Sequence, residues 1–515
     1  MKKLKNKIQL ITYPDSLGRD LKDLDLVLNK YLKEVVYGVH ILPMYPSSSD
    51  RGFSPLTHLK IDEKFGDWDD IIKIGKKFDL VVDLVVNHIS SQSKYFLDYL
   101  EKGDASQYAD FFITTQKFSK RMKWNQKLSP KVVNFIEKIL NIIRHIDIIF
   151  HKGGVNRITL KKIFRPRPGS PFVTFKFQDK TKKNLWCTFS SDQLDLDIKN
   201  EKVLEIFKNI LSFFKEKKVK MVRLDAVGYA AKERDTRNFM IPQTYKFIAW
   251  LSDQAHQNGI LALPEVHSHY TNQLGLAKIK EVDYVYDFAL PVLVLEAIHG
   301  KNASNLKKWI KIRPTNCITT LDTHDGLPIP DVEDLIEKKS LDSLVALIKS
   351  FGGNEAFRAS GRNSDNVDIY QLNCTYFSAL GENKNAYLIA RAIQFFLPGI
   401  PQVYYVGLLA GENDMDLLER TGHGRDINRH YYSIAEIEKE LKRDVVKRLF
   451  ALMKFRNEYE AFNGKFKLYK SAEDIIVMGW TKNKLRAKLE VYLKKKEAKI
   501  TYWDQEKNQE KYINI

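Results

Sequence analysis

The sequence predicts an α/β protein built on a (β/α)8 barrel. Eight short apolar runs rich in β-branched residues alternate with longer amphipathic stretches such as residues 201–216. The runs are almost continuously apolar, which is typical of parallel strands buried on both faces. Eight strand–helix units favour a closed barrel. A doubly wound sheet is the alternative, but no GxGxxG motif follows the first run. The predicted strands are residues 8–13, 37–43, 80–86, 220–227, 260–266, 282–288, 317–323 and 400–406.

Two intervals between these strands are too long to be simple connections. We expect them to form inserted subdomains at residues 89–199, after the third strand, and 326–381, after the seventh. The barrel itself then comprises residues 1–88, 200–325 and 382–461. The tail at 462–515 has strand-like alternation and turn residues, so we expect a small C-terminal β domain.

Composition excludes several classes of protein. The chain has 515 residues, of which 44% are hydrophobic, so it buries a core and is not a disordered polypeptide. Cys187, Cys317 and Cys374 are scattered, which excludes a disulfide scaffold and a zinc finger. No apolar run approaches the ~18 residues of a membrane span. The basic start lacks a cleavage site, so we expect a cytoplasmic protein.

The net charge of +19 is unevenly distributed along the chain. Residues 114–165 hold 13 lysines and arginines against two acids, and residues 481–515 hold ten against five. These two segments contain most of the excess, and the remainder is nearly neutral. A solvated lysine-rich face and a basic binding surface both stay open. No nucleic-acid motif accompanies the charge, so we expect no nucleic-acid partner.

Polar residues that a packed core would reject cluster where four of the predicted strands end. A single Asp in such a place is usually a helix cap, but capping does not account for four strand ends. Barrel enzymes assemble their sites from the C-terminal ends of several strands, so these side chains are expected to converge. They are Asp83, Asn87 and His88; Arg223 and Asp225; Glu265 and His267; and Asp322, His324 and Asp325.

Paired carboxylates of this kind indicate glycosyl transfer. One carboxylate attacks the anomeric carbon and the other protonates the departing oxygen. Arg223 lies two residues before Asp225 on the same strand face, where it favours the ionised nucleophile. Glu265 follows the apolar LALP segment, and desolvation there would keep its proton near neutral pH. Asp325 would be a third carboxylate that supports positive charge on the sugar.

The blocks DLVVNH, VRLDAV, LPEVH and TLDTHD resemble, in order, the four signatures of the α-amylase superfamily of glycoside hydrolases. RGFSPLTHLKIDEKFGDWDD, FRPRPGSPF, DIYQLNCTYFSALG and FFLPGIPQVYYVGLLAGENDM narrow the resemblance to the sucrose phosphorylase family. It extends from about residue 8 to residue 462. What it implies is retaining phosphorolysis of sucrose to α-glucose 1-phosphate and fructose, with Asp225 as nucleophile, Glu265 as acid and base, and Asp325 as transition-state stabiliser.

The resemblance also implies binding residues and substrates. The glucosyl unit would be held by Asp50, Phe53, His88, Arg223, His324 and Arg425. The acceptor would be held by Pro166, Arg167, Tyr229, His267, Asp368, Ile369, Tyr370 and Gln371, with Pro166, Arg167, Ile369 and Tyr370 nearest to phosphate. Arginine suits phosphate because its guanidinium binds two oxygens at once. Inorganic phosphate is then a co-substrate, and no cofactor is expected.

Several alternatives remain open. Sucrose 6′-phosphate or glucosylglycerate could replace sucrose, the chain could be an α-glucoside hydrolase, or it could be a catalytically idle basic binding protein. In amylases the residue matching Asn87 helps to hold calcium, but no Asp-rich oxygen cage stands nearby, so we expect no metal. Residues 117–163 form a longer insertion than in the family, with an apolar stripe from Val132 to Phe150. A homodimer is also open.

Overall fold

Eight parallel strands form the centre of the molecule, as predicted. The computed structural model describes residues 3–119, 162–166, 170–359, 367–504 and 506–515. The barrel strands are β1 (Gln9–Thr12), β2 (Gly38–Ile41), β3 (Asp79–Val85), β8 (Met221–Asp225), β9 (Leu261–Pro264), β10 (Val285–Asp287), β11 (Cys317–Thr319) and β15 (Ile400–Tyr404). Each observed strand lies within one residue of a predicted run, although most are shorter than predicted.

The order of the strands confirms a barrel and excludes the doubly wound alternative. Along the sheet they run β10-β11-β15-β1-β2-β3-β8-β9, so the first strand pairs with both the second and the last. The remaining edge is joined by the Tyr284 amide, which donates to the Ala262 carbonyl at 3.3 Å. Because all eight strands run in the same direction, their C-terminal ends meet at one rim.

Amphipathic helices surround the barrel, and the predicted helix at 201–216 shows why. Asn200 caps helix α7 (Glu201–Glu216) by accepting from the Lys202 amide, and Phe207 and Phe214 are among its buried residues. The other principal helices are α1 (Leu21–Lys30), α2 (Trp68–Gly75), α8 (Pro242–Gln257), α9 (Tyr270–Leu276), α10 (Ala289–Gly300), α11 (Ser304–Ile312), α14 (Lys384–Phe396) and α18 (Asp444–Glu458). Shorter helices α13 (Tyr376–Ala379), α15 (Tyr405–Leu408), α16 (Met415–Thr421) and α17 (Ile434–Glu440) lie along the last third of the chain.

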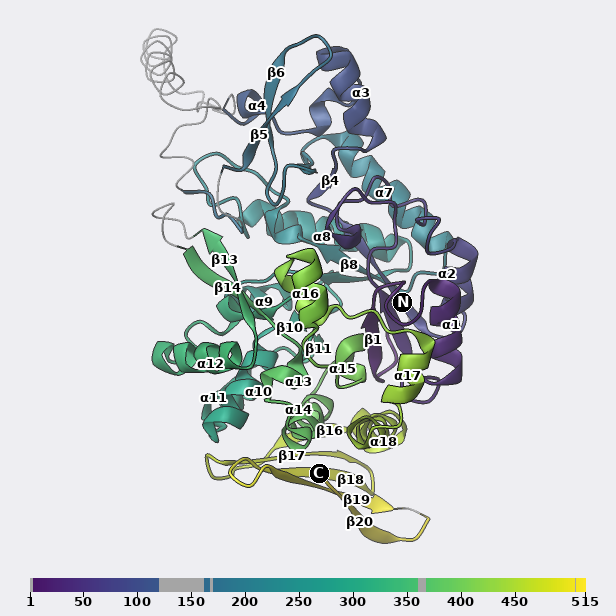
Figure 1. Cartoon of the computed structure of the whole chain (residues 1–515), viewed down its shortest axis with the longest axis vertical. Helices are drawn as coiled ribbons and strands as arrows, with labels where there is room; N and C mark the ends of the chain where they lie inside the picture. Colours follow the sequence, from purple (N-terminus) through teal and green to yellow (C-terminus); the bar gives the residue numbers. More distant parts are fainter. Residues whose placement is uncertain (1–2, 120–161, 167–169, 360–366, 505) are drawn as a thin grey trace.

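The chain between β3 and α7 forms small elements at one end of the molecule (Figure 1). The hairpin of β5 (Phe172–Lys176) and β6 (Lys182–Trp186) lies there beside helix α3 (Lys94–Lys102) and the short α4 (Thr115–Ser119). Strand β4 (His88–Ser90) pairs antiparallel with β7 (Gln193–Asp195) and brings both ends of this segment back to the barrel rim. The predicted apolar stripe between Val132 and Phe150 lies outside the described residues.

The chain after β11 carries a second set of elements. Strand β12 (Leu327–Pro328) pairs with β14 (Val367–Asn373), which pairs in turn with β13 (Asn354–Ala359). The 3-10 turn η5 (Ile329–Val332) follows β12, and helix α12 (Lys338–Ser350) precedes β13. The exact boundaries of both inserted subdomains stay predictions.

The predicted C-terminal β domain is a five-stranded antiparallel sheet at the opposite end of the molecule (Figure 1). Its strands are β16 (Lys465–Leu468), β17 (Ile475–Lys482), β18 (Leu485–Tyr492), β19 (Glu497–Asp504) and β20 (Gln509–Asn514). The Trp480 indole donates to the Phe396 carbonyl of α14 at 2.6 Å, which joins the sheet to the barrel. Among the described helices, none has the length and apolar character needed to cross a membrane.

Candidate active site

A pocket at the C-terminal rim of the barrel collects most of the predicted site residues. All four strand ends singled out in the sequence contribute to it, together with the segment 49–53 after β2 and residues from both insertions. Its described lining consists of Asp50, Phe53, His88, Phe189, Gln193, Asp225, Ala226, Gly228, Tyr229, Phe239, Glu265, Val266, His267, His324, Asp325, Tyr370, Gln371 and Arg425.

Arg223 forms a charged floor beneath Asp225. Its Nη1 donates to Asp225 Oδ1 at 2.7 Å and to Asp83 Oδ1 at 2.5 Å, and its side chain is buried. Burial raises the pKa of Asp225 well above its ordinary value, and Glu265 adds to this while Arg223 opposes it. The predicted effect of Arg223 is therefore present but does not outweigh burial, and the pocket tends to retain a proton.

The Arg223 guanidinium lies closer to Asp225 than to Glu265. Arg223 Nη2 is 3.7 Å from Glu265 Oε1, whereas Arg223 contacts Asp225 directly, so the guanidinium stabilises charge on Asp225 more strongly. Glu265 Oε2 accepts from the Ala226 amide at 3.0 Å. Ala226 has a left-handed backbone with φ of 53°, which is strained for a residue with a side chain. This strained turn links the strand that carries Asp225 to Glu265.

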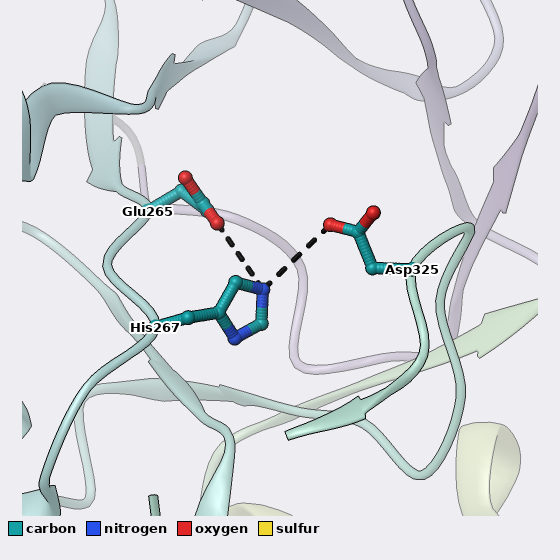
Figure 2. A group of neighbouring side chains, drawn as sticks. All are labelled: Glu265, His267 and Asp325. Carbon is teal, nitrogen blue, oxygen red and sulfur yellow. Dashed lines mark ion pairs between the residues drawn. The ribbon is translucent and has the colours of Figure 1, made fainter. Parts of the chain in front are cut away.

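Glu265, His267 and Asp325, which all line the pocket, form a close group (Figure 2). His267 Nε2 lies 3.2 Å from Glu265 Oε1 and 3.7 Å from Asp325 Oδ2. Within the described part of the chain this is the one group of such side chains compact enough to share a cation. The His267 Nε2 atom lies between the two carboxylates. The expectation of no metal remains a prediction.

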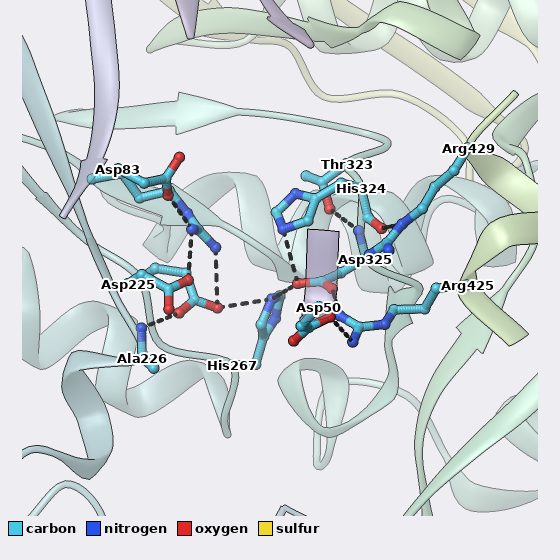
Figure 3. Close-up of polar contacts among 12 residues, drawn as sticks. Asp50, Asp83, Asp225, Ala226, His267, Thr323, His324, Asp325, Arg425 and Arg429 are labelled. Carbon is cyan, nitrogen blue, oxygen red and sulfur yellow. Dashed lines mark hydrogen bonds and ion pairs between the residues drawn. The ribbon is translucent and has the colours of Figure 1, made fainter. Parts of the chain in front are cut away.

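Asp325 is held as a carboxylate. Burial opposes its ionisation, but His324, His267 and Arg425, whose Nη1 donates to Asp325 Oδ1 at 2.6 Å, together hold the pKa of Asp325 well below its ordinary value. Burial lowers the pKa of His324 well below 6.5. Arg425 also reaches Asp50 Oδ1 at 3.1 Å and thereby joins the two acids across the pocket (Figure 3).

Phe53 forms an apolar wall of the predicted glucosyl site. Its ring stacks on His324 with centroids 4.9 Å apart and planes at 5°. Its backbone carbonyl is the partner of His88 Nε2 at 2.8 Å and accepts from Gln193 Nε2 at 3.0 Å. Burial lowers the pKa of His88, so this ring is a neutral donor. These contacts hold Phe53 in a fixed position facing the pocket.

An arginine clamp holds the neighbouring Asp50. Asp50 and Arg51 both have left-handed backbones, with φ of 50° and 49°, which is costly in a residue with a side chain. The Arg51 guanidinium lies 3.9 Å from the Tyr13 ring centre and 4.3 Å from that of Tyr431, and it donates to Ser16 Oγ at 2.9 Å. The stacked guanidinium thus compensates for the strained turn that directs Asp50 to the pocket.

A buried lysine lies where the sequence raised the question of calcium. Lys232 Nζ is 2.6 Å from Asp195 Oδ2, donates to Asn87 Oδ1 at 3.0 Å and also contacts the Tyr229 carbonyl. The Lys232 side chain is 2% exposed and that of Asp195 is fully buried. An ammonium group therefore supplies positive charge between these oxygen atoms, and it ties β7 to the segments that carry His88 and Tyr229.

The described acceptor residues lie on the outer side of the pocket. Tyr229 and Tyr370 are buried and line it, and the Tyr370 ring meets His267 edge-on at 6.3 Å. Pro166 is buried but does not line the pocket; Phe164, two residues earlier, stacks on Phe239 at 4.5 Å between ring centres. Arg167 lies outside the described residues, as do the side chains of Asp368 and Ile369 on β14.

Two strand-end acids that the sequence grouped with the site do not line it. Asp322 instead pairs with Arg391 at 2.5 Å, which joins the β11 loop to α14. Asp83 lies beneath the pocket as a partner of Arg223. Conversely, Phe189, Gln193 and Phe239 line the pocket, although no motif distinguishes them. The only feature of the sequence that indicates these residues is their position: Phe189 and Gln193 lie near the end of the first insertion, and Phe239 lies in the segment after a predicted strand.

Comparisons with known proteins agree with this geometry. The catalytic domain of the α-amylases matches residues 12–325, so the chain belongs to the α-amylase family. Sucrose phosphorylase of Bifidobacterium adolescentis is 42% identical over 489 residues, covering 93% of this chain and 90% of that protein. Glucosylglycerol phosphorylase of Marinobacter adhaerens is 40% identical, covering 99% of both.

A crystal structure is equally similar. Sucrose 6F-phosphate phosphorylase from Thermoanaerobacter thermosaccharolyticum is 42% identical, superposes with a TM-score of 0.89, and covers 100% of this chain and 98% of that one. Within the α-amylase family, the chain thus groups with the glycoside phosphorylases. These relatives carry three different substrate names at nearly equal identity. Overall identity therefore does not choose the acceptor.

Proposed function

We propose that the chain is a sucrose phosphorylase that transfers a glucosyl unit to inorganic phosphate with retention of configuration. The observation that carries the proposal is the placement of Asp225, Glu265 and Asp325 around one pocket with Arg223 bonded to Asp225. This arrangement would supply the nucleophile and the acid and base of a retaining mechanism, with a third carboxylate beside them.

The first half-reaction would cleave sucrose. Asp225 attacks the anomeric carbon, the bond from that carbon to the fructose oxygen breaks, and the oxygen takes the proton of Glu265. Fructose leaves, and a β-glucosyl ester remains on Asp225. Asp325, kept ionised by Arg425, stabilises the positive charge that develops on the sugar ring. Phe53 and His324 would contact the ring of the glucosyl unit.

The second half-reaction would consume phosphate. A phosphate oxygen attacks the anomeric carbon, the bond to Asp225 breaks, and the phosphate proton passes to Glu265. α-Glucose 1-phosphate leaves and the enzyme returns to its starting state. Phosphate must compete with water, so the acceptor side should bind an anion. Arg167 remains the proposed bidentate partner for phosphate, with Pro166, Ile369 and Tyr370 beside it.

The described lining favours plain sucrose over sucrose 6′-phosphate. Arg425 is the one lysine or arginine among the described lining residues, and it is already engaged by Asp325 and Asp50 on the glucosyl side. A phosphorylated acceptor would need a further cation for its extra charge. The neutral side chain of Gln371 suits the hydroxyl groups of fructose. The complete set of carboxylates argues against an idle binding protein.

The deciding experiment compares substrates directly. Purified protein is given sucrose, sucrose 6′-phosphate, glucosylglycerol or glucosylglycerate, each with and without phosphate, and glucose 1-phosphate and free glucose are measured separately. We expect phosphate-dependent glucose 1-phosphate from sucrose. Release of free glucose alone would indicate a hydrolase, and turnover of another donor without sucrose turnover would contradict the proposed substrate.

Variants test the roles. Asp225→Ala and Glu265→Gln should each lower kcat by a factor of about 1,000 or more, because each removes a group that reacts directly. The exposed Glu419→Gln is the matched control and should behave like the wild type. Near-normal turnover by either site variant would contradict these roles.

The absence of cofactors and nucleic-acid partners, the cytoplasmic location and a homodimer stay predictions.

A further inference from the structure

A buried carboxylate behind the pocket has no part in the two half-reactions. Asp331 lies in η5, its side chain is fully buried, and its Oδ1 accepts from Gln273 Nε2 at 2.5 Å. Its Oδ2 faces His267 Nδ1 at 3.9 Å, and among the described residues neither atom has a hydrogen-bond partner. A buried carboxylate needs a compensating charge. Of the described cationic side chains, only His267 forms an ion pair with it.

Ionised carboxylates around His267 favour the protonated, positively charged form of its imidazole ring. Nε2 faces Glu265 and Asp325 on the pocket side, while Nδ1 faces Asp331 on the far side. Two uncharged rings also lie against His267: Phe288 stacks on the imidazole at 4.0 Å, and Tyr370 of β14 approaches its edge. Burial opposes ionisation, but the carboxylates raise the pKa of His267 to about 10. His267 is therefore an imidazolium at neutral pH.

We propose that Asp331 is a positioning residue that fixes the His267 ring with its charge directed to the acceptor side of the pocket, and that this fixed cation lets phosphate compete with water. The inference rests on the proposed phosphorylase function. During the second half-reaction Glu265 acts as a base, so phosphate meets a carboxylate beside its attacking oxygen. Electrostatic repulsion would disfavour phosphate without affecting water, and a cation 3.2 Å from Glu265 offsets it.

The charge at Asp331 is the property to change. Asp331→Asn keeps the size of the side chain and removes the charge that stabilises the imidazolium, so His267 becomes neutral more readily. The measured quantity is partition of the glucosyl enzyme: the ratio of glucose 1-phosphate to free glucose formed from sucrose at fixed phosphate. We expect this ratio to fall about tenfold or more, with KM for phosphate rising, because charge-assisted hydrogen bonds are roughly twice as strong as neutral ones.

Asp334 provides the matched control. It lies three residues further on and also pairs with a histidine, His269, at 3.2 Å, but its side chain is 84% exposed. Asp334→Asn should leave the ratio of glucose 1-phosphate to glucose unchanged, together with the KM values for sucrose and for phosphate. Asp331→Glu restores the charge and should recover most of the preference for phosphate. Fructose is a neutral acceptor, so exchange of labelled fructose into sucrose should fall much less than phosphate use in Asp331→Asn.

The outcomes separate the two proposals. If wild-type protein forms no glucose 1-phosphate, the proposed function fails before Asp331 is tested. If the wild type is active and Asp331→Asn lowers phosphate, water and fructose transfer equally, Asp331 has only a structural role and the inference is wrong. Should Asp331→Asn not fold, Asp331→Ser replaces it, with the same expected shift. Failure of both to fold would assign Asp331 to stability and overturn the inference.

Discussion

Replacing Lys232 by methionine should destabilise the protein through a mechanism that the structure defines closely. Lys232 Nζ is the positive partner of the buried Asp195 at 2.6 Å and also binds Asn87. Methionine is similar in length and apolar, so packing is largely kept, while the carboxylate of Asp195 loses its positively charged partner and keeps only its hydrogen bonds from Thr188. Removing one member of a buried pair typically costs about 3–5 kcal/mol, because an uncompensated charge remains.

The cost converts into a change of unfolding temperature. The entropy of unfolding is about 2.1 cal/mol/K per residue, or about 1.1 kcal/mol/K for a chain of 515 residues that unfolds cooperatively. A loss of about 3–5 kcal/mol therefore lowers Tm by about 3–5 °C. Differential scanning calorimetry measures the Tm of the variant and of the wild type, and circular dichroism at 20 °C checks that the variant is folded.

A double variant and an exposed control make the reasoning refutable. Lys232→Met combined with Asp195→Asn leaves no unpaired charge, so it should recover about half of the lost Tm or more. Lys30→Met removes the exposed ion pair with Glu438, whose side chains are 58% (Lys30) and 48% (Glu438) exposed. This variant should keep Tm within about 1 °C of the wild-type value. The reasoning is refuted if Lys232→Met melts like the wild type, or if the double variant is no more stable than the single one.

Three further predictions follow from the site. The pKa of His267 is raised to about 10 in the folded protein, against about 6.5 in the unfolded chain. The contribution of His267 to the stability of the folded state is therefore complete below pH 6.5 and is lost as pH rises toward 10. The Tm of the wild type should fall between these pH values, and the Tm of His267→Gln should fall much less. Arg51 has a left-handed backbone, so Arg51→Gly should melt about 1 °C higher than Arg51→Ala, because alanine keeps the backbone strain and glycine relieves it. Both variants lose the guanidinium contacts, so both should raise KM for sucrose by displacing Asp50. Equal Tm values for the two variants would contradict the strain argument. Because the Lys232 ammonium lies between Asp195 and Asn87, EDTA should change neither Tm nor turnover, and a chelator-dependent loss of either would contradict the expectation of no metal.

Much of the active site was predictable because barrel topology converts order in the sequence into position in space. Strand ends of a parallel barrel share one rim, so Asp225, Glu265 and Asp325 meet although they lie far apart in the chain. The resemblance to a family added Asp50 and Arg425, which no strand pattern indicates. Asp322 shows the limit of this reasoning: it follows the same strand as Asp325, yet its side chain turns to Arg391.

The sequence by itself determined the eight strands, the barrel, the C-terminal sheet and the carboxylates at the rim. These features depend on local periodicity and on the ends of strands, which are visible in a single chain. Only the tertiary structure decided which charges compensate one another. Lys232 and Asn87 are 145 residues apart in the chain, and Asp331 approaches His267, a residue of the barrel, from the insertion after β11. Burial and distance set those partnerships, and neither quantity is written in the order of residues.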